Sequence, residues 1–284
     1  MKTAIVLEGG ASRALFGAGV TDALLEGGIY PDLAVGSSAG IANGVSYISR
    51  QKGRALDMAM KFTADKRYMG IKYLFKKGVR SYYNIPFVFE EIPNVHNPFD
   101  YDALINSTCA TYACVTNIEN GKAEYLPLDG SDKEWRAIVA TCALPMLFQP
   151  VEIDGKKYLD GGIAASVPVD FALEQGCDKV LCVLTRERSY RKKDSDPSLK
   201  LASLYYRKHP EFAKVIEKRN VIYNENREHL FDLEKQGRIM IIAPENTEGF
   251  SRTEKRPEAL RSIHEQGVRI ANENIEKIKE YMTK

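Results

Sequence analysis

The stretch PDLAVGSSAGIANGVSYISRQ, residues 31–51, combines a short apolar run, a serine flanked by glycines and a second apolar segment. Residues 31–37 predict a buried strand and residues 39–51 predict a helix. The residues around Ser38 match G-x-S-x-G, the strand-to-helix turn that exposes the hydroxyl of a nucleophilic serine. The stretch therefore predicts one strand-turn-helix unit of an α/β fold, with Ser38 as a candidate nucleophile.

A similar unit comes before this stretch. Residues 2–7, KTAIVL, form a continuous apolar run that is typical of a strand buried on both faces. The tripeptide EGG follows, and residues 12–26 then place apolar side chains on one stripe of a helix that ends at the glycines of positions 27 and 28. This alternation of strands and helices predicts a parallel sheet covered by helices.

The rest of the chain predicts two hairpins, two further strands and several helices. Residues 111–128 predict a hairpin with an Asn-Gly turn, and residues 149–162 predict one with an Asp-Gly turn that brings Asp160 to a strand end. Buried strands are expected at residues 177–185 and 238–244. Helices are expected at residues 55–95, 134–144, 168–176, 201–236 and 256–282.

Length and composition limit the domain organisation and the class of partner. The chain has 284 residues, of which 44% are hydrophobic and 27% charged, which suits one large α/β domain or two small ones. The most linker-like stretch, residues 186–200, does not clearly divide it. We predict a single domain over residues 1–284, with the motifs in about 3–186, and with C-terminal helices and one further strand in about 187–284. A net charge of +2 gives no global field for nucleic acid or anionic lipid, so we expect no nucleic-acid partner.

Cysteine usage and the apolar segments predict a cytoplasmic protein. The five cysteines are odd in number and lack C-x-x-C spacing, as is usual for free thiols in a reducing compartment. The first apolar run is too short for a secretory signal, and no later run reaches the roughly 18 residues that a membrane span needs.

A serine nucleophile needs a proton acceptor. A Ser-His-Asp α/β-hydrolase is one interpretation, but Ser38 follows only the second predicted strand. His209 and His229 lie in charged helical segments, and His264 lies in an amphipathic helix, so nothing directs them toward Ser38. The other interpretation uses Asp160, which ends a strand in Asp-Gly-Gly, although alone it also fits an ordinary hairpin exit. A serine that only caps its helix is the structural alternative.

The loop GGASRA, residues 9–14, follows the first strand and opens the first helix. In a parallel sheet it lies beside the second strand and its serine, so its backbone amides can form an oxyanion hole. Dinucleotide binding is a rival use of such a loop. Gly17 and Gly19 fall inside the helix, however, and no acidic residue closes the second strand, so this use is disfavoured.

Three motifs in order, EGGASRALFGAGV, VGSSAG and YLDGG, resemble the patatin-like phospholipases, particularly their bacterial group. The resemblance covers roughly residues 3–186. It implies a three-layer α/β/α sandwich with a central, mostly parallel sheet. It also implies a Ser-Asp dyad without histidine that hydrolyses acyl lipid esters through an acyl-enzyme, with no metal or cofactor. The implied partner is an acyl lipid or a small ester.

The resemblance assigns roles by position. It implies that Ser38 is the nucleophile within the elbow glycines, that Asp160 is the base before the acid-turn glycines, and that a loop holds the oxyanion. The elbow glycines are Gly36 and Gly40, and the acid-turn glycines are Gly161 and Gly162. The oxyanion loop consists of Gly9, Gly10, Ala11, Ser12 and Arg13, with the amides of Gly10, Ala11 and Ser12 as donors and Arg13 at the basic position.

Two alanines depart from the family pattern. Ala11 and Ala14 stand where the family has glycine, and an alanine forced to a positive φ costs about 1 kcal/mol. These departures support an alternative in which the protein is a non-catalytic, lipid-binding or regulatory member of the family. The intact Ser38 and Asp160 oppose it.

Residues 66–83 mix basic and aromatic side chains. Such a segment predicts either an interfacial flap in transient contact with a membrane surface or a solvated helix whose aromatic side chains pack inward. The head group, the acyl chain and the oligomeric state are not encoded in any motif of the sequence.

Overall fold

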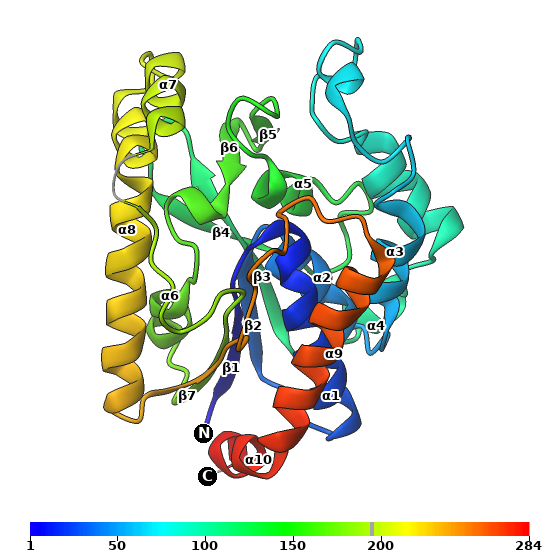
Figure 1. Ribbon diagram of the computed structural model, residues 1–284, viewed down its shortest axis with the longest axis vertical. Helices are drawn as coiled ribbons and strands as arrows, with labels where there is room; N and C mark the ends of the chain where they lie inside the picture. Colours follow the sequence, from blue (N-terminus) through cyan, green and yellow to red (C-terminus); the bar gives the residue numbers. More distant parts are fainter. Residues whose placement is uncertain (194–195, 284) are drawn as a thin grey trace.

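A computed structural model describes residues 1–193 and 196–283. Within these residues eight strands form one sheet in the order β5-β6-β3-β2-β1-β7-β8, and β4 pairs with β3 (Figure 1). The strands are β1 (Thr3–Leu7), β2 (Leu33–Ser37), β3 (Ala110–Asn117), β4 (Ala123–Pro127), β5 (Val151–Ile153), β6 (Lys156–Asp160), β7 (Lys179–Val183) and β8 (Ile239–Ile242).

The centre of the sheet is parallel and one edge is antiparallel. Strands β3, β2, β1, β7 and β8 run parallel to one another, whereas β4 and β6 pair antiparallel with β3, and β5 pairs antiparallel with β6. Every residue of β1 and β2 is buried, as expected for parallel strands covered on both faces.

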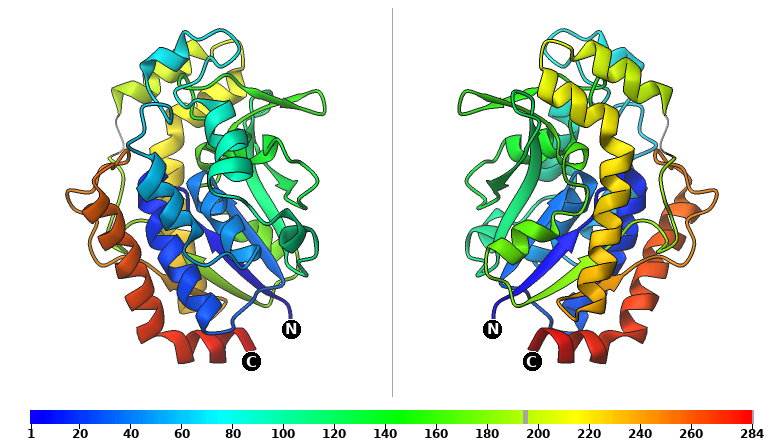
Figure 2. Two further views of the ribbon diagram at one scale, coloured as in Figure 1. Left: turned by 90° about the vertical axis from the view of Figure 1, so that its right-hand side faces the viewer. Right: turned by 90° about the vertical axis from the view of Figure 1, so that its left-hand side faces the viewer.

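Helices cover both faces of this sheet, as Figure 1 and Figure 2 show. The helices are α1 (Leu15–Glu26), α2 (Ala39–Ile48), α3 (Arg54–Phe62), α4 (Tyr101–Ile105), α5 (Arg136–Cys142), α6 (Val169–Glu174), α7 (Pro197–Tyr205), α8 (Pro210–Lys235), α9 (Pro257–Glu273) and α10 (Ile275–Thr283). Successive residues of β1 face opposite sides, so Ile5 packs in the cluster with α1, α2 and α9, and Val6 packs in the cluster with α6 and α8. This arrangement confirms the predicted three-layer α/β/α fold with a mostly parallel sheet.

The C-terminal helix α9 packs closely on α1. A Cβ atom on Gly19 would overlap the carbonyl oxygen of His264, and one on Gly267 would overlap that of Phe16. Gly19 therefore serves helix packing, which agrees with the argument against a dinucleotide loop.

Four helix predictions need correction. The segment 201–236 is divided between α7 and α8, and the segment 256–282 is divided between α9 and α10. The helix expected at 12–26 begins with a 3₁₀ turn, Ala11–Ala14, and becomes α-helical only at Leu15. The segment 55–95 is not one helical region: α3 is followed by turns, a short 3₁₀ turn (Ile71–Leu74) and a π-helix (Pro86–His96). Tyr68 and Tyr73 are buried, so turns rather than a helix bury part of the aromatic set of residues 66–83.

Across the described ranges, no helix has both the length and the apolar character needed to cross a bilayer. All five cysteines are free thiols.

Candidate active site

Ser38 occupies a sharp turn between β2 and α2. Its backbone has φ 52° and ψ −137°, a conformation that a residue with a side chain adopts only where the surroundings enforce it. Its side chain makes no capping hydrogen bond to α2, so the helix-cap interpretation is wrong. The neighbouring Ser37 is 0% exposed and donates its hydroxyl proton to the carbonyl oxygen of Ala165 at 2.6 Å, whereas Ser38 lines a cavity.

Close packing explains the glycines on either side of Ser38. A Cβ atom on Gly36 would lie 2.7 Å from the carbonyl oxygen of Leu7, and one on Gly40 would lie 2.6 Å from that of Glu8. Both distances are too short for a real side chain. The turn can therefore sit against the end of β1 only because these two positions lack side chains.

The register of β3 brings Asp160 to Ser38. Ser37 at the end of β2 pairs with Cys114, and Asp160 at the end of β6 pairs with the next residue, Val115. Both strands lie on the same side of β3, because β4 occupies its other side at these positions. The pairing of β6 with β3 thus begins at the residue after the last one that pairs with β2. Ser38, the residue that follows β2, therefore comes level with Asp160.

Asp160 is held rigidly and is 2% exposed. Its N–H donates to the carbonyl oxygen of Ala143 at 2.8 Å, its own carbonyl accepts from the Thr116 hydroxyl at 2.9 Å, and its Oδ1 accepts from the N–H of Gly162 at 2.8 Å. A Cβ on Gly161 would overlap the carbonyl oxygen of Cys114, so the first glycine after Asp160 is required for the turn to fit beside β3.

The environment of Asp160 favours a proton acceptor. Burial raises the pKa of its carboxyl above the ordinary value of 3.8, while the charge of Arg219 and a hydrogen bond from the Ser38 side chain oppose this rise. Ser38 and Asp160 line the same cavity, and a buried carboxylate with a raised pKa is a better base than an exposed one.

The loop after β1 lies directly against this pair. A Cβ on Gly9 would be 3.0 Å from the Cβ of Ser38, and one on Gly10 would be 2.6 Å from Oγ1 of Thr185. Ala11 has a φ of 51°, in the region that favours glycine, whereas Ala14 has an ordinary φ of −64°. Of the two departures from the family pattern, only Ala11 therefore strains the backbone.

Ser12 does not fit its expected role as an oxyanion donor. Its N–H already donates to the carbonyl oxygen of Arg252 at 3.1 Å, and the N–H of Arg13 donates to Gly10 at 3.2 Å. Within residues 1–193 and 196–283 no hydrogen bond uses the amides of Gly10 and Ala11, and both residues line the cavity. The guanidinium of Arg13 lines it too, and burial, followed by the charge of Arg186, lowers its pKa.

Sequence reasoning missed a threonine of α5. The Oγ1 atom of Thr141 accepts the N–H of Ser38 at 2.8 Å, and the Thr141 hydroxyl donates to the carbonyl oxygen of Cys114. Cys142, the last residue of α5, lines the same cavity as Ser38. The segment that contains them carries only a helix signal, and the contact with Ser38 spans 103 positions.

A second missed group joins the loop to the C-terminal part of the chain. Glu8 is buried at the end of β1, where its carboxylate accepts the N–H of Thr185 at 2.6 Å and the hydroxyl of Tyr223 at 2.8 Å. Tyr223 belongs to α8. The one available signal is that a charged residue, Glu8, directly follows the apolar run of β1.

The cavity that Ser38 and Asp160 line has a volume of about 590 Å³. Its wall also includes Gly9, Gly10, Ala11, Arg13 and Gly162, whereas Gly36, Gly40, Gly161 and Ser12 are not part of the wall. Further wall residues come from the segment after β7 and from α8.

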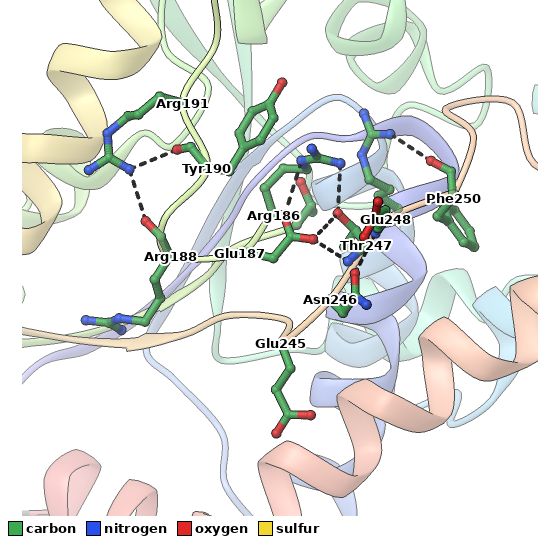
Figure 3. Close-up of polar contacts among 12 residues, drawn as sticks. Arg186, Glu187, Arg188, Tyr190, Arg191, Glu245, Asn246, Thr247, Glu248 and Phe250 are labelled. Carbon is green, nitrogen blue, oxygen red and sulfur yellow. Dashed lines mark hydrogen bonds and ion pairs between the residues drawn. The ribbon is translucent and has the colours of Figure 1, made fainter.

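Side chains at the rim tie two loops together. Figure 3 shows Arg186 and Glu187, which follow β7, in contact with Thr247, which follows β8. Arg186 donates to Oγ1 of Thr247 at 2.7 Å, and the Thr247 hydroxyl donates to Glu187 at 2.6 Å.

The four histidines lie elsewhere. His264 of α9 contacts Asp22 of α1 at 2.9 Å, and His229 contacts Asp170 at 2.8 Å. His96 ends the π-helix, and His209 comes directly before α8. In the described part of the chain no histidine lines the cavity around Ser38.

Known proteins are similar to part of this chain. The uncharacterized protein YjjU of Escherichia coli (strain K12) is 28% identical over 191 residues, which are 65% of this chain and 52% of that protein. Lysophospholipase nte1 of Aspergillus niger is 28% identical over 195 residues, which are 63% of this chain and 11% of that protein. The chain thus spans about half the length of YjjU and about a tenth of nte1.

The crystal structure of VipD from Legionella pneumophila superposes with a TM-score of 0.42 and 10% identity, over 96% of this chain and 67% of that chain. One family model, described as a domain of unknown function (DUF6363), matches residues 209–283. Another, described as patatin-like phospholipase, matches residues 5–173 and so covers more than half of the sequence. The chain belongs to the patatin-like phospholipase family.

Proposed function

We propose that this protein is a serine lipid acyl hydrolase, of the phospholipase A, lysophospholipase or carboxylesterase type, in which Ser38 and Asp160 form the catalytic dyad. The observation that carries the proposal is the register on β3, since Ser37 and Asp160 pair with the consecutive residues Cys114 and Val115. The buried carboxylate, with its raised pKa, is suited to accept the proton of the Ser38 hydroxyl.

The reaction proceeds in two steps. As Asp160 takes the hydroxyl proton, the Ser38 Oγ forms a bond to the acyl carbon, and the negative charge moves to the carbonyl oxygen. The ester C–O bond then breaks, and the alcohol leaves with the proton from Asp160. In the second step Asp160 takes a proton from water, the resulting hydroxide attacks the acyl-enzyme, and the fatty acid departs as Ser38 regains its proton.

The developing negative charge needs hydrogen-bond donors. We assign this task to the amides of Gly10 and Ala11, which line the cavity and have no other acceptor among the described residues. The amide of Ala39, at the first position of α2, adds a helix N-terminus beside Ser38. Two relatives support the lipid class, since one is named a lysophospholipase and another, from Mus musculus, is named patatin-like phospholipase domain-containing protein 6, 28% identical over 63% of this chain and 13% of that protein.

We also infer a transient contact with a lipid surface. Ile71 and Phe75 are 69% and 83% exposed, and the exposed lysines 72, 76 and 77 surround them. Figure 2 shows this segment and α7 at one end of the molecule, and α7 carries the exposed Leu201 and Leu204. Sedimentation with anionic vesicles should capture the wild type, and a Phe75→Ser variant should bind several-fold less. Equal binding of the two proteins would contradict the inference.

A fluorophosphonate probe and a lysophospholipid assay test the main proposal. We expect the wild type to be labelled and active and Ser38→Ala to be neither, while Ser37→Ala is the matched control that keeps the reactive hydroxyl. A folded wild type that is neither labelled nor active would instead favour the non-catalytic alternative.

A further inference from the structure

The cavity around Ser38 is far more basic than the protein as a whole. Its described wall contains seven Lys or Arg residues and three Asp or Glu residues, whereas the whole chain has a net charge of only +2. The basic residues are Arg13, Arg186, Arg191, Lys192, Lys193, Arg219 and Arg252. A concave wall of one sign concentrates its potential inside the cavity, so this wall favours an anionic ligand.

The acidic groups of the wall have other partners. Glu8 accepts from the N–H of Thr185 and the hydroxyl of Tyr223. Asp196 accepts the N–H and the hydroxyl of Ser198 at the start of α7. The third, Asp160, is the proposed base. Within residues 1–193 and 196–283 these carboxylates form no ion pair with a cation of the wall.

Five of the seven basic side chains fall into two groups, whereas Arg191 pairs with Glu228 and Lys193 belongs to neither group. On the side of the oxyanion loop, Arg186 contacts Glu187 and Thr247, and Arg13 donates to the carbonyl oxygen of Phe250 at 3.4 Å. Lys192, Arg219 and Arg252 form no ion pair within the described ranges. Arg219 contacts the acid turn, and Arg252 adjoins the loop after β1 through its carbonyl oxygen, which accepts the N–H of Ser12. We call these three side chains the acid-side cluster.

Arg219 places the acid-side cluster next to the proposed base. Its Nε donates to the carbonyl oxygen of Gly162 at 3.1 Å. A Cβ on Gly162 would lie 3.0 Å from Oδ1 of Asp160 and 3.8 Å from Nη2 of Arg219, so a single small residue separates the carboxylate from the guanidinium. The Nη atoms of Arg219 donate no hydrogen bond to any part of the chain that the structure describes.

Lys192 and Arg219 are half-buried and Arg252 is exposed, and the positive charges of the three side chains repel one another. Burial, followed by the charge of Arg219, lowers the pKa of Lys192 to about 7. Burial lowers the pKa of Arg219 as well, where the charge of Asp160 opposes and that of Arg252 adds to the decrease. A bound anion would relieve this repulsion, and guanidinium groups bind the oxygens of a phosphate group particularly well.

We propose that Lys192, Arg219 and Arg252 form an anion-binding subsite, which makes an acyl ester with a net anionic phosphate head group the preferred substrate. The proposal rests on the proposed function, because it places the scissile ester at Ser38 and the phosphate beside Asp160. Arg219 and Arg252 come from residues 209–283, matched by the model of a domain of unknown function, so this segment would select the substrate.

Three short-chain esters separate the head group from the acyl chain. They are 1-octanoylglycerol 3-phosphate, 1-octanoylglycerophosphocholine and 1-octanoylglycerol, assayed as monomers. We expect the wild type to show at least a tenfold higher kcat/KM for the phosphate ester than for the neutral one, mostly through KM, and a smaller preference at high salt. The zwitterionic ester should be intermediate or poor.

Variants test which residues cause the preference. Arg252→Met and Arg219→Met should each reduce the ratio of phosphate-ester to neutral-ester kcat/KM about five- to tenfold. The ratio is the readout because Arg219 also acts on Asp160 and therefore on all substrates. Lys218→Met, next to Arg219 on α8 but exposed and outside the cavity wall, is the matched control and should leave the ratio unchanged. Arg219→Lys should retain part of the preference.

Calorimetry with non-hydrolysable ligands keeps the two proposals apart. Wild-type protein should bind octyl phosphate more tightly than octyl phosphocholine, and Arg219→Met should remove the difference. Inorganic phosphate should compete if the subsite recognises phosphate itself, and its failure would show that the site needs a lipid phosphate. A protein that hydrolyses neutral esters through Ser38 but prefers neither ester overturns the subsite alone. Selective binding of octyl phosphate without any ester hydrolysis overturns the proposed function and keeps the subsite.

Discussion

Ala11 and Ser38 are non-glycine residues with nearly the same positive φ, 51° and 52°, and they face one cavity from two different loops. For Ser38 the strained turn exposes a hydroxyl. For Ala11 the strain has no such benefit, because glycine would adopt the same backbone at no steric cost.

Ala11→Gly should therefore stabilise the protein or leave its stability unchanged. Relief of the strained left-handed conformation raises the free energy of unfolding by about 1 to 2 kcal/mol, and the greater freedom of glycine in the unfolded chain cancels part of this increase. Ala14→Gly should lower the free energy of unfolding by about 0.5 to 1 kcal/mol, since Ala14 has φ −64° and is buried. Urea denaturation of both variants measures these changes, and equal effects of the two substitutions would contradict the conformational argument.

Fluorophosphonate should label Ser38 and not Ser37. The hydroxyl of Ser37 is buried and bonded to Ala165 at 2.6 Å, so it can neither reach the probe nor lose its proton readily. Mass spectrometry of the labelled peptide distinguishes the two residues. A modified Ser37, or labelling of Ser38→Ala, would refute the assignment.

Asp160→Asn should lower kcat by about 10² to 10⁴, the usual cost of losing a general base. The amide keeps an oxygen that can accept the N–H of Gly162, so the turn should stay folded. Ester hydrolysis and circular dichroism measure the two effects.

The four histidines provide the matched comparison for this loss. Replacement of His96, His209, His229 or His264 by Gln should change kcat less than about threefold, because none of them lines the cavity. A folded His→Gln variant as inactive as Ser38→Ala would replace the dyad by a Ser-His-Asp mechanism.

The pH profile should report the carboxyl of Asp160. Only its ionised form accepts a proton, so kcat/KM should fall as the pH decreases through its pKa, which burial raises above 3.8. The positive charges of Arg219 and Arg252 favour the ionised form, so Arg219→Gln should move the acidic limb to higher pH. A neutral ester avoids titration of the substrate. Lys218→Gln should leave the limb in place, and an unshifted limb in Arg219→Gln would disprove this electrostatic coupling.

Thr141 should act as a positioning residue for the Ser38 turn. Thr141→Val removes the acceptor of the Ser38 N–H and the donor to Cys114, which leaves buried groups unpaired at a cost of about 1 to 3 kcal/mol. We expect lower stability and about tenfold lower kcat, with KM nearly unchanged. Thr141→Ser keeps the hydroxyl and should restore most of the kcat, whereas an equally inactive serine variant would point to loss of packing alone.

The sequence by itself was sufficient for the features that depend on neighbouring residues. Apolar runs located β1, β2 and β7, turn dipeptides located both hairpins, and nearby glycines marked Ser38 and Asp160. These patterns are readable because a strand, a tight turn or a helix restricts side chains a few positions apart. The helix expected for residues 66–83 was wrong. The turns of this segment are stabilised by the packing of Tyr68 and Tyr73 rather than by a helical repeat of apolar residues.

Only the tertiary structure decided which groups surround the serine. The register of β3 sets Asp160 beside the end of β2, although the residues belong to strands far apart in the chain. Thr141 reaches Ser38 across 103 positions, and Arg219 reaches Gly162 across 57. The carbonyl of Arg252 takes the amide of Ser12, which sequence reasoning had assigned to the oxyanion. Such contacts depend on how the sheet and the helices pack. No local pattern encodes them, because the residues around each partner indicate only the helix, strand or turn to which that partner belongs.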